Sequence, residues 1–339
     1  MSCKYSVNYP FLPVPTELSF EPINLCNAKC YCCPYAWLGE DADYRGKKMT
    51  PEQIEILIED FANGLKIHRV QEWNAHIQPW RFSDPLVCPS LELILELADR
   101  FKINVIITTN GISFTDKNCR ILDKYQHLIK KINISIIGIN AEDIKKYMGV
   151  NWEVTKKRFL AAKENWPRVS SMMTIGVKDA LDRPMSNDTV RGLRSEYRQY
   201  TKGIVKIKRG WLHNRMSQGD GVWTEPKQFS IHEKQFVQGC TMDFGKILRR
   251  LEVMVDGTAV LCCDDATQLT NYGNVFEDGI EKIWKRITDE HKLIYDKMYS
   301  ERKKNLICNT CSRASFKVTD QIQKGIVDSQ NRVLQHMAV

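Results

Sequence analysis

The sequence lacks any long apolar run that would mark export or membrane insertion. Its first residues contain no apolar stretch of signal-peptide length, and Pro10, Pro13 and Pro15 interrupt them. No run reaches the length of a transmembrane helix. We therefore expect a cytoplasmic protein with no membrane partner. No internal repeat is visible either, which excludes solenoids and propellers.

Concentrated charge is also missing. Lys and Arg number 49 against 41 Asp and Glu, a formal net charge of +8, and these residues are spread along the whole chain. Proteins that bind nucleic acid without specificity usually concentrate their positive charge on one patch or segment. The pattern favours a solvated basic surface over a nucleic-acid partner.

Cysteine, by contrast, is abundant, with twelve residues in the chain. A reducing cytosol keeps thiols free, so these cysteines are expected to bind metal rather than to form disulfides. Cys3, Cys88 and Cys119 stand alone and are expected to be ordinary thiols. The other nine are grouped at positions 26, 30, 32 and 33, at 240, at 262 and 263, and at 308 and 311.

Hydrophobic periodicity predicts six strands that alternate with helices in the first two thirds of the chain. Such alternation is typical of an α/β fold, in which right-handed crossovers curl a parallel sheet toward an open barrel. A helix is expected to begin at Thr50 and Pro51, which suit a cap and a first turn. The strands are expected at residues 17–23, 69–75, 104–110, 132–139, 171–177 and 204–208, and further helices at 90–101, 116–130, 142–148, 152–165 and 187–200.

A second, smaller α+β domain is expected after the barrel. Residues 212–233 are polar and rich in turn formers, which indicates a linker or a long active-site loop. Asp256-Gly257 between two apolar runs, residues 248–255 and 258–262, predicts a hairpin with a two-residue turn. The expected division is an N-terminal extension (1–16), the barrel (17–211), the linker (212–233), the small domain (234–316), which includes a helix at 278–298, and a C-terminal helix (317–339).

The first cysteine group lies on one short loop directly after the first predicted strand. Cys26, Cys30 and Cys33 have three and two residues between them, so three thiolates could hold three irons of a 4Fe-4S cluster. The fourth iron then keeps open positions for a ligand. A structural zinc site fits less well, because it closes its shell with four ligands. Cys32 lies within reach of the loop but off this spacing.

This CxxxCxxC loop after strand one resembles the signature of the radical S-adenosylmethionine (radical SAM) superfamily. The resemblance implies a partial, TIM-like (β/α)6 barrel in which the open iron binds the amine and carboxylate of S-adenosylmethionine. Electron transfer then releases a 5′-deoxyadenosyl radical that abstracts a hydrogen atom from substrate. A reducing partner such as flavodoxin or ferredoxin is implied as well.

Other segments resemble the same family along the barrel. Residues 82–86, Phe-Ser-Asp-Pro-Leu, stand where the family carries Gly-Gly-Glu-Pro; Asp84 keeps the carboxylate and both glycines are lost. Residues 108–111 look like the end of the family's third strand, and Ser135 like its polar fourth-strand residue, although a satisfied hydroxyl in a strand explains Ser135 equally well. The cofactor contacts that the resemblance implies are Cys32, Ser83, Asp84, Thr109, Asn110 and Ser135.

The second cysteine set is Cys240, Cys262, Cys308 and Cys311, which can converge if the hairpin folds back. Four thiolates close a metal's shell, and the spacing alone suits zinc and iron-sulfur comparably. The surrounding pattern, from Gly257 to Cys311, resembles the auxiliary-cluster domain behind many radical SAM barrels, in its short form, called twitch, rather than the longer SPASM form. Cys263 is an alternative ligand to Cys262.

The resemblance favours oxidation of a small polar biosynthetic intermediate, with the auxiliary cluster as electron acceptor. Radical modification of a ribosomally made peptide is the alternative, a nucleotide substrate comes third, and a zinc-stabilised binding protein is the alternative outside the enzymes. Residues after strand ends are the candidate bases, because parallel barrels bind ligands there. They are Glu72, His76, Lys178, Asp179, Arg209, His213 and Arg215.

Overall fold

The computed structural model describes residues 12–38, 45–70, 75–180, 183–208, 239–240, 249–295 and 314–315. The chain divides into two compact units. We call residues 20–55 and 76–212 the barrel unit, and residues 1–19, 56–75 and 213–339 the composite unit. The predicted linker and C-terminal helix lie outside the described residues, and the predicted domain boundaries stay predictions.

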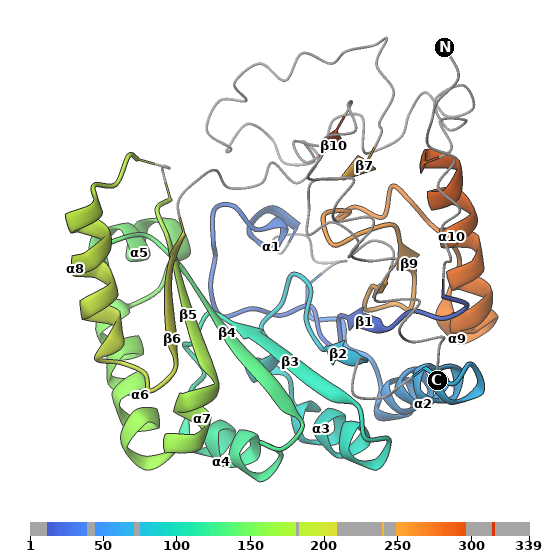
Figure 1. Cartoon of the computed structure of the whole chain (residues 1–339), viewed down its shortest axis with the longest axis horizontal. Helices are drawn as coiled ribbons and strands as arrows, with labels where there is room; N and C mark the ends of the chain where they lie inside the picture. Colours follow the sequence, from blue (N-terminus) through green and yellow to red (C-terminus); the bar gives the residue numbers. More distant parts are fainter. Residues whose placement is uncertain are drawn as a thin grey trace. The chain divides into compact units, whose positions relative to one another are not determined.

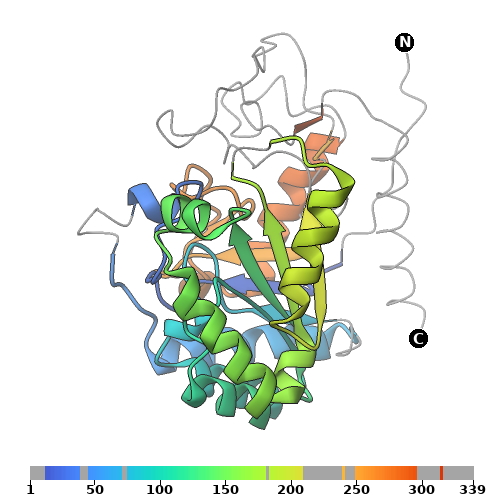
Figure 2. The ribbon, with the colours of Figure 1, turned by 90° about the vertical axis from the view of Figure 1, so that its left-hand side faces the viewer.

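Five parallel strands form the sheet of the barrel unit, in the order β6-β5-β4-β3-β2. Figure 1 shows helices along one side of these strands, and in Figure 2 α6 and α8 lie over β4 to β6. The strands are β2 (His76–Gln78), β3 (Asn104–Thr109), β4 (Ile129–Ile137), β5 (Met173–Lys178) and β6 (Ile204–Lys208). The helices are α1 (Pro34–Leu38), α3 (Leu91–Arg100), α4 (Asp116–Lys124), α5 (Ala141–Met148), α6 (Trp152–Asn165), α7 (Pro167–Met172) and α8 (Asn187–Arg198).

The two faces of this sheet differ because side chains alternate along each strand. One face is apolar and buried, as Ile134, Ile175 and Val177 show. The other face is polar and partly exposed: Ser135 pairs with Gly176, and Gly176 with Lys206. Helices therefore cover the first face, and the second face carries polar and partly exposed side chains.

The prediction for the second strand is wrong in position. Helix α2 (Pro51–Ile67) opens with the expected cap, since Thr50 Oγ1 accepts from Gln53 N and Gln53 Oε1 accepts from Thr50 N. It is followed by a turn in which Arg69 adopts a φ of +53°, so residues 69–70 cannot start a strand. Strand β2 begins only at His76.

Other predicted boundaries moved by a few residues. Helix α4 ends at Lys124 instead of reaching 130, because the chain is already extended in β4 from Ile129. The short helices α1 and α7 were not predicted. Pro167 starts α7 in the segment directly before β5.

The composite unit contains strands in the order β1-β8-β9. They are β1 (Glu17–Phe20, of which Phe20 belongs to the barrel unit), β8 (Arg250–Val253) and β9 (Ala259–Val260). Buried Glu17 accepts from Arg249 Nε and Arg250 Nε, each at 3.0 Å. Helices α9 (Val275–Asp278) and α10 (Ile280–Tyr295) follow, and the Trp284 indole donates to Leu12 O at 2.8 Å.

The predicted hairpin is present, but its turn has three residues instead of two. Met254 N donates to Thr258 O, and Gly257 N donates to Met254 O. Gly257 adopts a φ of +89°, and a Cβ there would lie 2.5 Å from Phe276 Cδ2. A residue in this left-handed conformation at the end of a three-residue turn is a known hairpin geometry, and it favours glycine.

A separate two-stranded sheet in the composite unit joins β7 (Gly239–Cys240) to β10 (Ala314–Ser315). Across the described residues, no helix is long and apolar enough to cross a membrane.

Candidate cluster and cofactor site

The loop that carries Cys26, Cys30 and Cys33 is fixed to the end of helix α5. Lys29 N donates to Met148 O and Tyr31 N donates to Tyr147 O, both at 2.9 Å. The rings of Tyr31 and Tyr147 are also in contact, with centroids 5.2 Å apart. The loop then turns into α1, where Cys33 N donates to Cys30 O. The three cysteines are thus held on one ordered backbone segment.

The cysteine thiols of this loop lie within electrostatic reach of one another. Burial, the charge of Asp84 and that of Cys33 raise the pKa of Cys26 to about 12. Burial, followed by Cys33, Cys32 and Cys26, raises the pKa of Cys30 well above its usual range. Several partly desolvated thiols in one place are costly to ionise unless a cation compensates, and bound iron does so.

Asp84 is the central polar group of the site and is 1% exposed. Its Oδ1 accepts from Leu86 N at 3.0 Å, and its Oδ2 accepts from Thr109 Oγ1 at 2.7 Å and Asn110 N at 2.8 Å. Burial raises the pKa of this carboxyl, while these hydrogen bonds act in the opposite direction. The carboxylate therefore joins the end of β3 to the segment after β2.

Asn110 extends this network to the cysteine loop. Its Nδ2 donates to Asn27 Oδ1 at 2.7 Å and to Cys26 Sγ at 3.5 Å, and its Oδ1 accepts from Ile112 N at 2.8 Å. Asn27 in turn donates to Ser113 Oγ. The structure thus brings Cys26, Asp84, Thr109 and Asn110 together, although they come from three separate segments of the chain.

The hydroxyls of Ser83 and Ser135 differ in their exposure. The Ser83 hydroxyl oxygen is shielded from solvent and has no hydrogen-bond partner among the residues that the structure describes. Ser135 is exposed on the polar face of the sheet, so it is not the satisfied hydroxyl of a buried strand. Both can accept a hydrogen bond from an amine or a hydroxyl.

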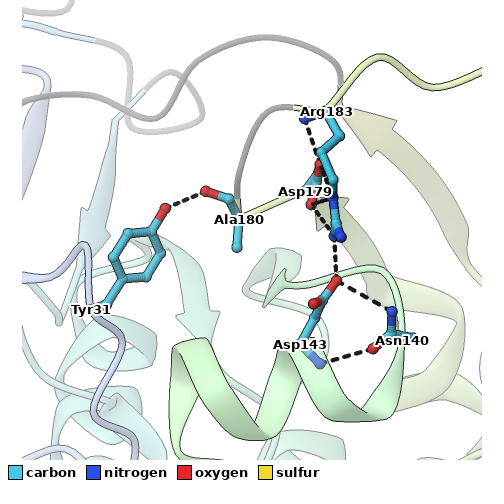
Figure 3. Close-up of polar contacts among 6 residues, drawn as sticks. All are labelled: Tyr31, Asn140, Asp143, Asp179, Ala180 and Arg183. Atoms are coloured by element: carbon cyan, nitrogen blue, oxygen red, sulfur yellow. Dashed lines mark hydrogen bonds and ion pairs between the residues drawn. The ribbon is translucent and has the colours of Figure 1, made fainter. Parts of the chain in front are cut away.

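A second network holds the loop after β5, as Figure 3 shows. Arg183 donates to both carboxylate oxygens of Asp179 and also to Asp143, whose backbone N donates to Asn140, the N-cap of α5. On the other side of this loop, the Tyr31 hydroxyl donates to Ala180 O. The loop after β5 is therefore tied both to α5 and to the cysteine loop.

The second cysteine set is described only in part. The strand pairing sets Cys240 opposite Ala314, three positions after Cys311 in the sequence. Cys262 is buried just after β9, and its carbonyl accepts from Asp265 N at 3.2 Å. Cys308 and Cys311 lie outside the described residues.

Sequence profiles identify both halves of this arrangement. The profile of the radical SAM superfamily matches residues 20–183, and that of an iron-sulfur cluster-binding domain, SPASM, matches residues 244–312. The chain contains a radical SAM superfamily domain. It is a radical SAM enzyme with an auxiliary cluster domain, and these domains imply 4Fe-4S clusters and S-adenosylmethionine as cofactors.

Solved structures share the fold of this radical SAM enzyme. The BtrN complex with AdoMet and 2-DOIA is 17% identical, with a TM-score of 0.54 over 91% of this chain and 97% of BtrN. Streptococcus suis SuiB bound to S-adenosylmethionine is also 17% identical, with a TM-score of 0.51 over 90% of this chain and 72% of SuiB. No curated protein shows significant similarity to the sequence.

The residues of the site fit the cofactors that the superfamily implies. Three thiols on one loop suit three irons of a cluster, and the shielded Ser83 hydroxyl suits a donor such as an amine. No three metal-binding side chains in the described part converge as they would around a single ion. A cluster does not require that, since its thiolates bind separate irons.

Two of the candidate bases, His76 and Lys178, lie at opposite ends of the sheet. His76 is the first residue of β2 and pairs with Asn104, the first residue of β3, so it is at the amino end of the sheet. The expectation that it follows the strand is wrong, because β2 starts later than predicted. Lys178 ends β5 and pairs with Lys208, at the carboxyl end. Glu72, Arg209, His213 and Arg215 lie outside the described residues.

Asp179 does follow β5, as expected, but it is only 2% exposed and bound by Arg183. Arg183, Asp143 and Tyr31 are not among the site residues that the sequence predicts, although all three hold the loop after β5. Nothing in the spacing links Arg183 to Asp143, 40 positions away, whereas a tyrosine inside the cysteine motif was a visible signal.

Proposed function

We propose that the protein oxidises a small polar biosynthetic intermediate by two electrons. The observation that carries this proposal is the second cysteine set: Cys262, Cys308 and Cys311 lie within the range of the SPASM match, and Cys240 pairs with Ala314, three positions after Cys311 in the sequence. If Cys240, Cys262, Cys308 and Cys311 all bind one cluster, no iron there is open to substrate. Its role is then electron transfer or structural support, and the proposal takes electron transfer.

In this proposal, Cys26, Cys30 and Cys33 hold the cluster that cleaves S-adenosylmethionine. When bound, the first cluster would donate the electron that forms the 5′-deoxyadenosyl radical, and the auxiliary cluster would accept the electron that remains after the substrate has lost a hydrogen atom and a proton. Ser83 is proposed to accept a hydrogen bond from the methionyl amine, and Ser135 to contact the same cofactor. The predicted amine contact of Asp84 stays a prediction; three donors already use its oxygens, which leaves room for one more.

Lys178 is the described candidate best placed to take the substrate proton. It lies on the polar face at the carboxyl end of β5, where parallel barrels bind their ligands. Asp179 is next to it but is bound by Arg183, which favours a positioning role for that carboxylate. The reducing partner, a flavodoxin or ferredoxin, is proposed from the family alone.

The test compares the wild-type protein with a Cys308→Ala, Cys311→Ala variant, both purified and reconstituted without oxygen. We expect about eight irons per chain in the wild type and about four in the variant. With a metabolite extract as substrate source, the wild type should form 5′-deoxyadenosine and a small product lighter by two hydrogen atoms. The variant should still form 5′-deoxyadenosine but lose the product.

Circular dichroism must accompany this assay, because loss of a structural metal can unfold a small domain. A product of unchanged mass, or native product formation by a folded variant without the second cluster, would contradict oxidation and favour an isomerase or epimerase. Modification only of a peptide would favour the alternative substrate class. Stoichiometric zinc without iron would contradict oxidation by way of two iron-sulfur clusters.

A further inference from the structure

The amide of Asn110 has a fixed orientation beside the cysteine loop. Its Oδ1 accepts from Ile112 N, a group that can only donate, so Nδ2 must be the atom that faces Cys26 and Asn27. Both N–H groups of that amide are then used, one on Asn27 Oδ1 and one on Cys26 Sγ. The side chain therefore has no donor left for S-adenosylmethionine.

Asp84 holds Asn110 in this place. It accepts from Asn110 N and, through Oδ2, also from the neighbouring Thr109 hydroxyl. The carboxylate is buried, so these charge-assisted bonds are not weakened by water. Asp84 acts on the cysteine through Asn110 and is, in this respect, a positioning residue.

We infer that Asn110 raises the reduction potential of the cluster bound at Cys26 by donating its N–H to Cys26 Sγ. The inference rests on the proposed ligand role of Cys26. The backbone Ala28 N–H donates to the same sulfur at 3.4 Å, so Cys26 receives two donors. Reduction adds negative charge to the cluster and its sulfurs, and hydrogen-bond donors stabilise that charge.

Only the strengthening of this hydrogen bond on reduction shifts the potential, and the whole strength of one hydrogen bond to a charged acceptor, about 1.5 kcal/mol, sets the upper bound. That corresponds to about a tenfold change in the equilibrium between the reduced and oxidised cluster, or about 59 mV for one electron. Loss of the donor should lower the potential by up to this amount. A more reducing partner would then be needed for cleavage of S-adenosylmethionine.

The test is a redox titration of the anaerobic holoenzyme followed by electron paramagnetic resonance. The cluster that cleaves S-adenosylmethionine is recognised as the signal that changes when this cofactor is added. Asn110→Asp keeps the acceptor for Ile112 but removes the donor to Cys26, and the potential of its first cluster should fall by tens of millivolts, up to about 59 mV from the lost donor. The matched control is Asn151→Asp, since Asp also caps helix α6 well and adds the same charge away from the cysteines.

Asn110→Ala removes the donor without adding charge and serves as a second variant if Asn110→Asp loses iron; its potential should also fall. An unchanged potential with full iron in Asn110→Ala would overturn the inference. So would weaker S-adenosylmethionine binding at unchanged potential, which would make Asn110 a direct cofactor contact. Absence of any cofactor-sensitive signal in the wild type would instead overturn the proposed function.

Discussion

Two buried aspartates, one in each unit, organise the chain next to a cysteine, and they do so in different ways. Asp84 accepts from Leu86, Thr109 and Asn110, so two of its three partners are 25 and 26 positions away. Asp265, beside Cys262, accepts from Leu269 N and from both N and Oγ1 of Thr270. The first carboxylate joins separate loops of a barrel, whereas the second closes one local turn.

The comparison extends to the cysteines. Cys26, Cys30 and Cys33 are within eight consecutive residues, and hydrogen bonds to α5 fix that segment. The second set spans positions 240 to 311, and its members meet only if strands and turns bring them together. In the proposed assignment, the ligands of the first cluster are neighbours in the sequence, whereas those of the second depend on folding of the composite unit.

The largest expected effect is at the first cysteine loop. Cys30→Ala should remove the irons of that cluster and abolish 5′-deoxyadenosine formation. Each of the three thiolates holds one iron, and the fourth iron has no protein ligand that could compensate for the loss. Cys32→Ala is the matched control and should keep the irons, because Cys32 lies off the spacing of the three proposed ligands. Iron analysis and chromatography of 5′-deoxyadenosine measure the outcome. Full activity in Cys30→Ala with loss in Cys32→Ala would show that the ligands are wrongly assigned.

The next effect separates the adjacent cysteines of the composite unit. Cys262 is buried after β9, while Cys263 is half-buried within electrostatic reach of Arg250. Cys262→Ala should lose about four irons and keep formation of 5′-deoxyadenosine. Cys263→Ala should keep all irons. The reverse pattern of iron contents would make Cys263 the ligand.

Replacement of the two aspartates tests the comparison directly. Asp84→Asn and Asp265→Asn each set an amide N–H against backbone donors, so each should lower the free energy of unfolding by about 2 kcal/mol. Only Asp84→Asn should also change the magnetic resonance signal of the first cluster, because only Asp84 acts through Asn110. Urea unfolding and that signal are the measurements. An altered first-cluster signal in Asp265→Asn would mean that the two roles are not separate.

The smallest effect is the pH dependence of Asp84. Burial raises its pKa above the ordinary value of 3.8, so the native state holds this proton more tightly than the unfolded state does. Its contribution to stability is therefore full below pH 3.8 and is lost as the pH rises through the native pKa. In urea unfolding of the iron-free protein, the advantage of wild type over Asp84→Asn should be larger near pH 3.8 than at neutral pH. An advantage that grows with pH would contradict the direction of the shift.

The sequence predicts the alternation of the barrel well, because buried strands and amphipathic helices have different periods. Strands β3 and β6 and helices α5 and α6 lie within a residue of their predicted ranges. Strand β2 has only three residues, too few for a clear pattern, and a left-handed turn before it is not visible in the sequence. The error in β2 explains why His76 was expected at the wrong end of the sheet.

The sequence by itself determined the superfamily and the cysteines proposed as cluster ligands, since a spacing of three and two residues on one loop is a local property. It also predicted Asp84 and Asn110 as cofactor contacts, but only through the resemblance to the family. The tertiary structure decided what these two residues touch: Asp84 accepts from the end of β3, and Asn110 donates to Cys26, 84 positions away. Such contacts depend on which loops parallel strands bring to one edge of the sheet, and no local pattern encodes that.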